Sequence, residues 1–349
     1  MKKIILIILT FVLCSCTTTP SQSSETKTEP EPVEETKVEK TEITLSFVGD
    51  ITLGNFAGMS YARSFDKLYL DMDGDKTYFL KNVKSTFEKD DLTIGNLEGP
   101  LTTKTKHMDK KYAFKGKPEY AEILKAGNIE VMSIANNHSI DYYEAGRTET
   151  KETLEKQNID YFGYEKALIK EVKGKKIAFI GYSFASQSQI PADIKKQMTK
   201  AIGELKEQAD IIVVYYHWGM MYEYVPTKNQ VKLAHETIDL GADLIIGTHA
   251  HVIQGMETYK GKNIVYSLGN FCYGGNLNPR DTDSMIFQQT FTFEDDQLVD
   301  SSYHVLPCAM SSHENKNRNN FQPILLEGDE NERWQKKFQK YSDQIPSVE

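Results

Sequence analysis

The stretch of sequence that decides the fold is KNQVKLAHETIDLGADLIIGTHAH, residues 228–251. Its first half, Lys228–Leu240, has the apolar spacing of a helix and is followed by Gly241, a typical helix stop. Its second half is a short apolar run that ends at His249 and His251. A helix that leads into a buried strand is the repeating unit of an α/β protein.

The same arrangement recurs along the chain. Five more apolar runs end in polar, chemically useful residues: ITLSFVGD (43–50), DLTIGNLEG (91–99), IEVMSIANNH (129–138), DIIVVYYHWG (210–219) and NIVYSLGNF (263–271). A second helix is expected over 120–126, before Gly127. This alternation predicts an α/β domain with largely parallel strands. Because ligands of such sheets bind beyond the carboxyl ends of the strands, we expect the polar residues to form a single site.

The C-terminal part has a different pattern. Residues 285–308, MIFQQTFTFEDDQLVDSSYHVLPC, alternate apolar and polar side chains around Asp295 and Asp296. This pattern predicts an antiparallel hairpin beside the α/β core, and Glu332–Tyr341 predicts a terminal helix. Cys272 and Cys308 are too few to form a disulfide framework, and whether they pair stays open.

The N-terminus has the layout of a secretory signal. Residues 1–16, MKKIILIILTFVLCSC, combine a basic start with an apolar run that is too short to span a bilayer. Leu13-Cys14-Ser15-Cys16 resembles the lipobox of bacterial lipoproteins. That resemblance implies removal of residues 1–15, lipidation of Cys16, and an extracytoplasmic protein anchored to the cell membrane.

The segment after Cys16 predicts a disordered linker. Residues 16–41 are rich in Pro, Ser, Thr, Glu and Lys and contain no aromatic side chain, so they cannot bury enough apolar surface to fold. The folded domain is therefore expected over residues 42–349. The net charge of −9 argues against non-specific nucleic-acid binding. No lysine- or arginine-rich block stands out, so we expect a polyanionic ligand to be held by a local site with help from a metal.

The polar residues at the predicted strand ends make a mixed oxygen and nitrogen ligand set. They are Asp50, Glu98, Asn137, His138, His217, His249 and His251. Such a set suits Zn, Mn or Fe and is too rich in imidazole for Ca or Mg. It has enough ligands for two ions that together hold both oxygens of an in-line displacement. The His-x-His spacing points two side chains the same way if the backbone is extended.

Six motifs in order carry a resemblance to a known family. VGDITLG, NLEGPLT, IANNHSIDY, HWGMMYEYVPT, GTHAHVIQG and YSLGNF resemble the motif series of the CapA family of poly-γ-glutamate capsule-synthesis proteins. That family is related to the calcineurin-like metallophosphoesterases. The resemblance covers residues 43–323 and implies a four-layer α/β-β/α sandwich.

The resemblance also implies metal ligands. Asp50 corresponds to a ligand of one ion, Glu98 to the bridging or second-ion carboxylate, and Asn137 to an amide ligand. The later metal histidines correspond to His217, His249 and His251. Thr52 stands where related phosphoesterases have a ligand histidine, so the resemblance implies two divalent transition-metal ions, of which one has a weaker site.

Other residues are expected around the metals. By resemblance His138 protonates a leaving group or stabilises charge, with Asp141 orienting its ring. Asn96 and Glu98 fall where the related enzymes have a Gly-Asp motif. Asn96, Glu223 and Asn270 are candidates for contact with substrate or for support of the ligands. Glu223 is equally well explained as a solvated carboxylate, and Asn270 as part of a tight turn.

Two classes of function follow, and the residues leave both open. In the first, a lipoprotein acts in synthesis, export or attachment of poly-γ-glutamate, alongside membrane-bound ligase components, and its metals bind the polymer's carboxylates. In the second, an extracytoplasmic hydrolase without a capsule role cleaves a phosphoester or an amide. Whether the protein is an enzyme is therefore open, and His138 is essential only in the second class.

Overall fold

The computed structural model describes residues 39–185 and 190–348. The predicted signal peptide, Cys16 and nearly all of the predicted linker lie outside the described residues. The first strand, β1, is Lys40–Thr52, so the last two residues assigned to the linker belong to this strand.

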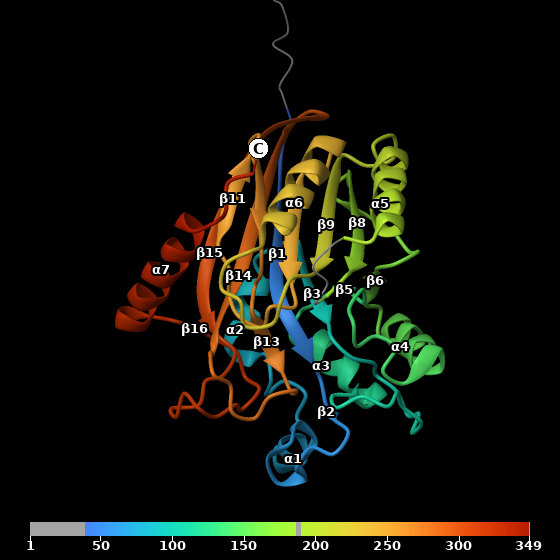
Figure 1. Cartoon of the computed structure of the whole chain (residues 1–349), viewed down its shortest axis with the longest axis vertical. Coiled ribbons are helices and arrows are strands. Elements are labelled where there is room, and N and C mark those ends of the chain that lie inside the picture. Colours follow the sequence, from blue (N-terminus) through green and yellow to red (C-terminus); the bar gives the residue numbers. More distant parts are fainter. Residues whose placement is uncertain (1–38, 186–189, 349) are drawn as a thin grey trace, which may run out of the picture. The chain divides into compact units, whose positions relative to one another are not determined.

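Two sheets form the centre of the domain (Figure 1). The first has the order β16-β15-β14-β1-β3-β5-β6, with β13 also pairing with β1. The pairings of β1 with β3, β3 with β5, and β5 with β6 are parallel. The strands after β1 are β3 (Leu92–Leu97), β5 (Val131–Ser133), β6 (Asp160–Phe162), β13 (Asn270–Tyr273), β14 (Asp283–Glu294), β15 (Gln297–Ala309) and β16 (Ile324–Leu325).

The second sheet has the order β11-β12-β10-β9-β8-β7. Its four inner strands are parallel and its two edge strands are antiparallel to their neighbours. Its strands are β7 (Leu168–Val172), β8 (Lys175–Ser183), β9 (Ile211–His217), β10 (Leu244–Thr248), β11 (Met256–Tyr259) and β12 (Lys262–Val265). A small separate ribbon pairs β2 (Asn55–Phe56) with β4 (Phe114–Lys115).

Successive side chains of a strand point to opposite faces of its sheet. The apolar ones therefore form three layers, one between the two sheets and one on the outer face of each. Phe47 of β1 faces the other sheet and packs with Tyr215 of β9, whereas Val48 belongs to a cluster on the outer side of the first sheet. The helices are α1 (Phe65–Asp71), α2 (Lys81–Phe87), α3 (Ala121–Ala126), α4 (Tyr143–Lys156), α5 (Ala192–Leu205), α6 (Lys228–Leu240) and α7 (Gly328–Asp343). Helices α2 and α3 cover the first sheet, and α5 and α6 cover the second. The four-layer α/β-β/α sandwich is therefore confirmed.

Most predicted elements form where the sequence placed them. Helix α6 begins with a capping box between Thr227 and Gln230 and ends at Gly241 in the left-handed region, with φ of 114°. The hairpin of β14 and β15 turns at residues 295–296, as predicted. The helix expected over 120–126 begins at Ala121, after a 3₁₀ turn over Pro118–Tyr120.

One predicted strand is divided between the two sheets. Residues 263–271 were expected to form a single strand, but β12 belongs to the second sheet and β13 to the first. The chain turns at Gly269, whose φ is 75°, and its carbonyl accepts a hydrogen bond of 3.0 Å from the Asp50 N–H. A side chain at Gly49 would place its Cβ 1.9 Å from the same oxygen. This crossing brings Asn270 next to Asp50.

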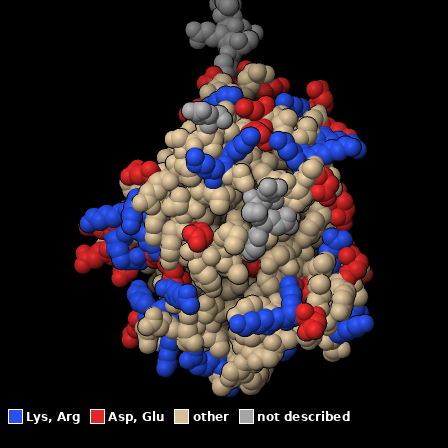
Figure 2. All heavy atoms as spheres, in the orientation of Figure 1, with Lys and Arg blue, Asp and Glu red and all other residues tan. Residues whose placement is uncertain are grey.

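The remaining features concern the surface and the thiols. Cys272 and Cys308 are both buried and free, so they do not form a disulfide in this structure. Among residues 39–185 and 190–348, no helix is long and apolar enough to cross a membrane. Acidic and basic side chains are both present on the face shown in Figure 2.

A pair of carboxylates at the amino ends of β3 and β5 gives a prediction for stability. Burial raises the pKa of Asp90 to about 6 and that of Glu130 to about 7. The folded protein therefore binds more protons than the unfolded chain between the ordinary carboxyl values and about 7, so stability falls as pH rises through this range. Glu130→Gln should reduce this loss, measured as the difference between urea midpoints at about pH 5 and about pH 8. An unchanged difference would contradict the assignment.

Candidate metal centre

The predicted ligands come together from the carboxyl ends of strands in both sheets. Asp50 lies near the end of β1, Glu98 follows β3, His217 is the last residue of β9, and His249 follows β10. In Figure 1, β1 and β9 both run toward the lower end of the domain. These strand-end residues therefore lie together in one cluster.

The carboxylate of Glu98 is the centre of this cluster. Glu98 is fully buried, and neither carboxylate oxygen has a hydrogen-bond partner among the described residues. Its Oε1 lies 3.8 Å from His138 Nε2, 3.7 Å from His217 Nε2 and 3.8 Å from His251 Nε2. A buried carboxylate without partners is costly. A cation bound between these atoms would offset that cost.

One set of donor atoms surrounds the Nε2 atom of His217. Asn137 Oδ1 lies 2.7 Å from it, and His249 Nδ1 lies 3.2 Å from it. Two ligands of one tetrahedral Zn ion, at 2.0–2.2 Å from the metal, are about 3.3–3.6 Å apart. The distances from His217 Nε2 to His249 Nδ1 and to Glu98 Oε1, 3.2 Å and 3.7 Å, are close to that spacing. The 2.7 Å between His217 and Asn137 is a hydrogen bond, so these two atoms would have to move apart for both to bind one ion.

The second set is poorer. His251 Nδ1 lies 2.9 Å from Asn270 Oδ1, so Asn270 orients the ring and leaves Nε2, 3.8 Å from Glu98 Oε1, as the nitrogen that could bind an ion. The 3.4 Å distance to Asp50 Oδ2 also involves Nδ1. The oxygens of Asp50 already accept hydrogen bonds from Asn96 Nδ2 at 2.8 Å and from the His249 N–H at 3.2 Å. Single atoms of Glu98, His249 and His251 lie within 4.8 Å of one another.

The first motif lacks a histidine, and the structure shows what replaces it. Thr52 is buried and its hydroxyl donates a hydrogen bond of 2.9 Å to the backbone oxygen of Glu98. The second set therefore has a carboxylate and an imidazole where a third donor would be needed for a closed site.

The His-x-His spacing was expected to lie in extended backbone. The two histidines after β10 are not extended. His249 has φ of 91° and His251 has φ of 56°. Both values lie in the left-handed region, which is uncommon for residues other than glycine and is found at functional sites. A turn, rather than the pleat of a strand, directs both rings into the cluster.

Two asparagines, Asn96 and Asn136, form hydrogen bonds that hold the candidate ligand Asp50 and the backbone of His138 in place. Asn96 is fully buried and links Asp50 to Asn136, whose Nδ2 lies 3.2 Å from Asn96 Oδ1. Asn136 also donates to the Leu97 backbone oxygen at 2.7 Å and accepts from the His138 N–H. Asn96 is therefore placed to hold Asp50 and His217 in position, since its Nδ2 lies 2.8 Å from Asp50 Oδ1 and 3.3 Å from His217 Nδ1.

Burial and the neighbouring charges shift the pKa values in the cluster in opposite directions. Burial raises the pKa of Glu98 to about 8, although the nearby His251 lowers it. Burial lowers the pKa of His249 to about 3 and the pKa of His217 well below its ordinary value. For His251 burial is outweighed by Glu98 and Asp50, which raise its pKa to about 9. His217 and His249 are thus neutral at neutral pH, as metal-ligating imidazoles must be.

His138 stands beside the cluster and has its own orienting partners. Its Nδ1 lies 2.8 Å from Asp141 Oδ2, which also accepts a hydrogen bond of 2.6 Å from the Phe114 N–H. The other Asp141 oxygen is paired with Lys110. Burial lowers the pKa of His138 more than Asp141 raises it. The ring is therefore neutral, and with its Nδ1 proton on the Asp141 side, Nε2 is ready to accept a proton.

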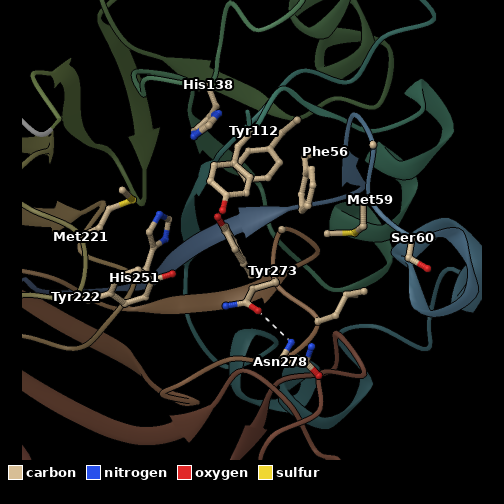
Figure 3. Close-up of a pocket in the computed structure, with 15 residues that line it drawn as sticks. Phe56, Met59, Ser60, Tyr112, His138, Met221, Tyr222, His251, Tyr273 and Asn278 are labelled. Atoms are coloured by element: carbon tan, nitrogen blue, oxygen red, sulfur yellow. Dashed lines mark hydrogen bonds between the residues drawn. The ribbon is translucent and has the colours of Figure 1, made fainter. Parts of the chain in front are cut away.

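A cavity of about 490 Å³ opens onto this centre. His138 and His251 lie at one end of it, and Met59 and Ser60 at the other, with the rings of Tyr112, Phe56 and Tyr273 between them (Figure 3). The remaining lining residues are Gly58, Phe114, Met221, Tyr222, Gly275, Asn276, Leu277 and Asn278. Most of the cavity wall is therefore aromatic or apolar.

Some predicted residues lie elsewhere. Glu223 is exposed and does not line the cavity, although its neighbours Met221 and Tyr222 do. Another histidine, His235 of α6, lies 2.9 Å from Glu257 and stacks on Tyr259, so it has partners of its own.

The segment of residues 102–117, which includes β4, was not predicted to lie beside the site. We expected no lysine-rich block, but this segment carries six lysines and one acidic residue: Lys104, Lys106, Lys110, Lys111, Lys115, Lys117 and Asp109. Its Lys110 forms an ion pair with Asp141 and donates a hydrogen bond of 3.2 Å to the Asn137 backbone oxygen. The spacing of these lysines in the sequence was the signal that could have identified the segment.

The chain matches known proteins in its sequence. Residues 44–274 match the family model for the bacterial capsule synthesis protein PGA_cap. The chain is 33% identical over 250 residues to the PGA biosynthesis protein CapA of Bacillus subtilis (strain 168), with 66% of this chain and 63% of that protein covered. It is 30% identical over 259 residues to the capsule biosynthesis protein CapA of Bacillus anthracis, with 67% and 61% covered.

The chain thus spans less than two thirds of the length of these two relatives. Among solved structures, a phosphatase from Mycoplasma pneumoniae has a TM-score of 0.45 at 14% identity, with 77% of this chain and 95% of that chain covered. The family model covers most of the folded domain, including both sets of candidate ligands. The chain therefore belongs to the family of the bacterial capsule synthesis protein PGA_cap, the CapA family.

Proposed function

We propose that this protein is a lipid-anchored, metal-binding component of poly-γ-glutamate capsule synthesis, whose metal centre acts on the polymer outside the membrane, alongside membrane-bound ligase components. The observation that carries the proposal is the buried carboxylate of Glu98, which has no hydrogen-bond partner among the described residues and lies within 3.8 Å of three imidazole nitrogens. The names of the two Bacillus relatives support the polymer as the object of the chemistry.

The residues fit one well-formed ion site and one weaker site. Glu98, Asn137, His217 and His249 would hold the first Mn, Zn or Fe ion, and Asp50 and His251 would share Glu98 to hold the second. A divalent ion bound there polarises a carbonyl, carboxyl or phosphoryl oxygen and lowers the pKa of water toward neutrality.

The chain itself supplies proton transfer and orientation. Asp141 fixes the His138 ring at 2.8 Å, and Lys110 and the Phe114 N–H hold Asp141 in place. His138 Nε2 therefore takes a proton on the cavity side and returns it to a leaving group. Under this proposal the acid role follows a step in which His138 first acts as a base.

A second candidate is an extracytoplasmic phosphoester hydrolase without a capsule role. The observation that favours it is the buried pair of His138 and Asp141. The pair serves proton transfer in both candidates, and in this one His138 would return its proton to the alcohol that leaves the phosphoester.

A capsule-forming bacterium that lacks its own family member separates these functions. We expect the parent chain to restore cell-bound poly-γ-glutamate and Glu98→Gln to fail, at equal protein levels. Restoration by both chains would contradict a role for the metal centre. Failure of both, together with phosphoester cleavage by the purified parent, would support the second candidate instead.

Anchoring gives a separate prediction. Cys16→Ser removes the thiol that would carry the lipid, so the protein should move from the membrane fraction to the culture medium. Because several acyl chains hold a protein far more firmly than one, the shift should be nearly complete. The measurement is immunoblotting of the two fractions, with Cys308→Ser as a control that leaves the N-terminus unchanged. Retention of the Cys16 variant in the membrane would contradict lipid anchoring.

A further inference from the structure

The cavity beside the metal centre has an unusual distribution of charge. Its lining residues include no aspartate, glutamate, lysine or arginine, although His138 and His251 stand at one end. Tyr112 and Tyr222 form parts of its wall and are 43% and 41% exposed, so both rings are available for contact with a ligand. The part of a ligand that lies in this cavity is therefore expected to be uncharged.

Three cations are attached to different walls of the same cavity. Arg63 Nη2 donates to Asn278 Oδ1 at 2.6 Å, Lys111 Nζ lies 5.0 Å from the centre of the Tyr112 ring, and the Arg280 guanidinium lies 5.9 Å from that of Tyr222. All three cationic residues are exposed. Because each contacts a residue that lines the cavity, their charges lie around its edge.

None of these three cations forms an ion pair with a carboxylate in the part of the chain that the structure describes. This is notable because acidic residues exceed basic ones, with a net charge of −9. Figure 2 shows Lys and Arg side chains over the lower part of the viewed face, at the end where α1 and β2 lie in Figure 1. Unpaired cations around an uncharged cavity attract an anion whose charge stays at the edge.

We propose that this cavity and the three cations select an anionic chain in which carboxylates alternate with uncharged methylene and amide segments. The uncharged segment lies between Tyr112 and Tyr222, next to His138 and His251. The carboxylates on either side bind Arg63, Lys111 and Arg280 at the edge. A γ-linked glutamate chain has this chemistry, because each repeat carries a carboxylate on a backbone of methylene and amide groups. This proposal rests on the proposed function and names the residues that give it specificity.

The test is binding of a short, fluorescently labelled γ-linked glutamate oligomer to the full chain in detergent micelles loaded with Mn²⁺, followed by anisotropy. The triple variant Arg63→Gln, Lys111→Gln, Arg280→Gln should weaken binding by about tenfold or more and flatten its dependence on salt. Tyr112→Ala with Tyr222→Ala should weaken binding several-fold while the salt dependence stays as in the parent, since these changes remove apolar contact and no charge.

A matched triple variant controls for the change in net charge. Lys81→Gln, Lys196→Gln and Lys232→Gln remove three exposed lysines from α2, α5 and α6, which cover the outer faces of the sheets. This control should bind as the parent does. Equal weakening by the control, or unchanged binding by both cavity variants, would overturn the inference while leaving the proposed function in place. A parent that holds Mn²⁺ but binds no oligomer would overturn both.

Discussion

Replacing Glu98 with glutamine should abolish the stabilisation that Mn²⁺ or Zn²⁺ gives to the parent protein. A ligand that binds only the folded state stabilises it by about 2.7 kcal/mol at a free concentration of about one hundred times Kd. One oxygen of the Glu98 carboxylate lies within 3.8 Å of His138, His217 and His251. Without its charge both predicted ion sites lose a shared ligand, so the variant should gain little from added metal.

The metal-free protein gives the opposite expectation for the same substitution. The buried carboxylate of Glu98 has no hydrogen-bond partner among the described residues, so without metal it costs stability, and a neutral amide of the same shape costs less. In EDTA the variant should therefore unfold at the same urea concentration as the parent or at a higher one. Glu223→Gln makes the same chemical change at an exposed position outside the cavity and should behave as the parent. A variant at Glu98 that keeps the full metal-dependent gain would contradict the site.

Replacing His138 with alanine should reduce turnover by about 10²–10⁴-fold, the usual contribution of a positioned acid or base. Its metal content should stay unchanged, because Asp141 and not a ligand residue holds the His138 ring at 2.8 Å. The readouts are cleavage of an aryl phosphoester or of γ-linked polymer, together with elemental analysis of the same sample. Asp141→Asn should give a smaller loss, since the ring stays in place but loses a charged partner.

His107→Ala is the matched control for the His138 variant. His107 is exposed in a loop, where its Nδ1 lies 2.8 Å from the Met108 backbone oxygen and its ring contacts that of Tyr142. It should leave both turnover and metal content as in the parent. If His138→Ala lost metal in proportion to activity, His138 would be a ligand. If it lost neither, the proton-transfer assignment would be wrong.

The positions of the candidate ligands could be predicted because they depend on strand direction. Parallel strands of both sheets end on the same side, so Asp50, Glu98, His217 and His249 converge although they are far apart in the sequence. The apolar runs alone were sufficient to place these residues at strand ends. The pairing of strands into two sheets came from the family resemblance.

Other features depend on contacts that no local pattern records. The run over 263–271 reads as one strand, but a turn at Gly269 carries it from one sheet to the other and places Asn270 against His251. The left-handed backbone of His249 and His251 could not be read from the residue types either, since histidine is uncommon there. Tertiary structure determines both features.

The cavity residues were missed for a related reason. Tyr112 comes from a segment without regular periodicity, so nothing in the sequence placed it near the metal centre. Tyr222 belongs to the motif HWGMMYEYVPT, but its residue type gave no sign that it would line the cavity. Lys110 was also missed, because its pairing with Asp141 joins two loops. By contrast, Glu223 was chosen from a motif that does lie near the cavity, but Met221 and Tyr222 are the residues of that motif that line it.

The central claim is that Glu98 and the surrounding imidazoles hold metal, and elemental analysis tests it most directly. The full chain, purified in detergent, is saturated with Mn²⁺ or Zn²⁺, dialysed, and compared with His249→Ala and Asp50→Ala. The account predicts about two ions per chain in the parent before dialysis and at least about one after it. His249→Ala should lose the tightly held ion and Asp50→Ala the weaker one. A parent that retains no ion, or variants that retain as much as the parent, would contradict the account.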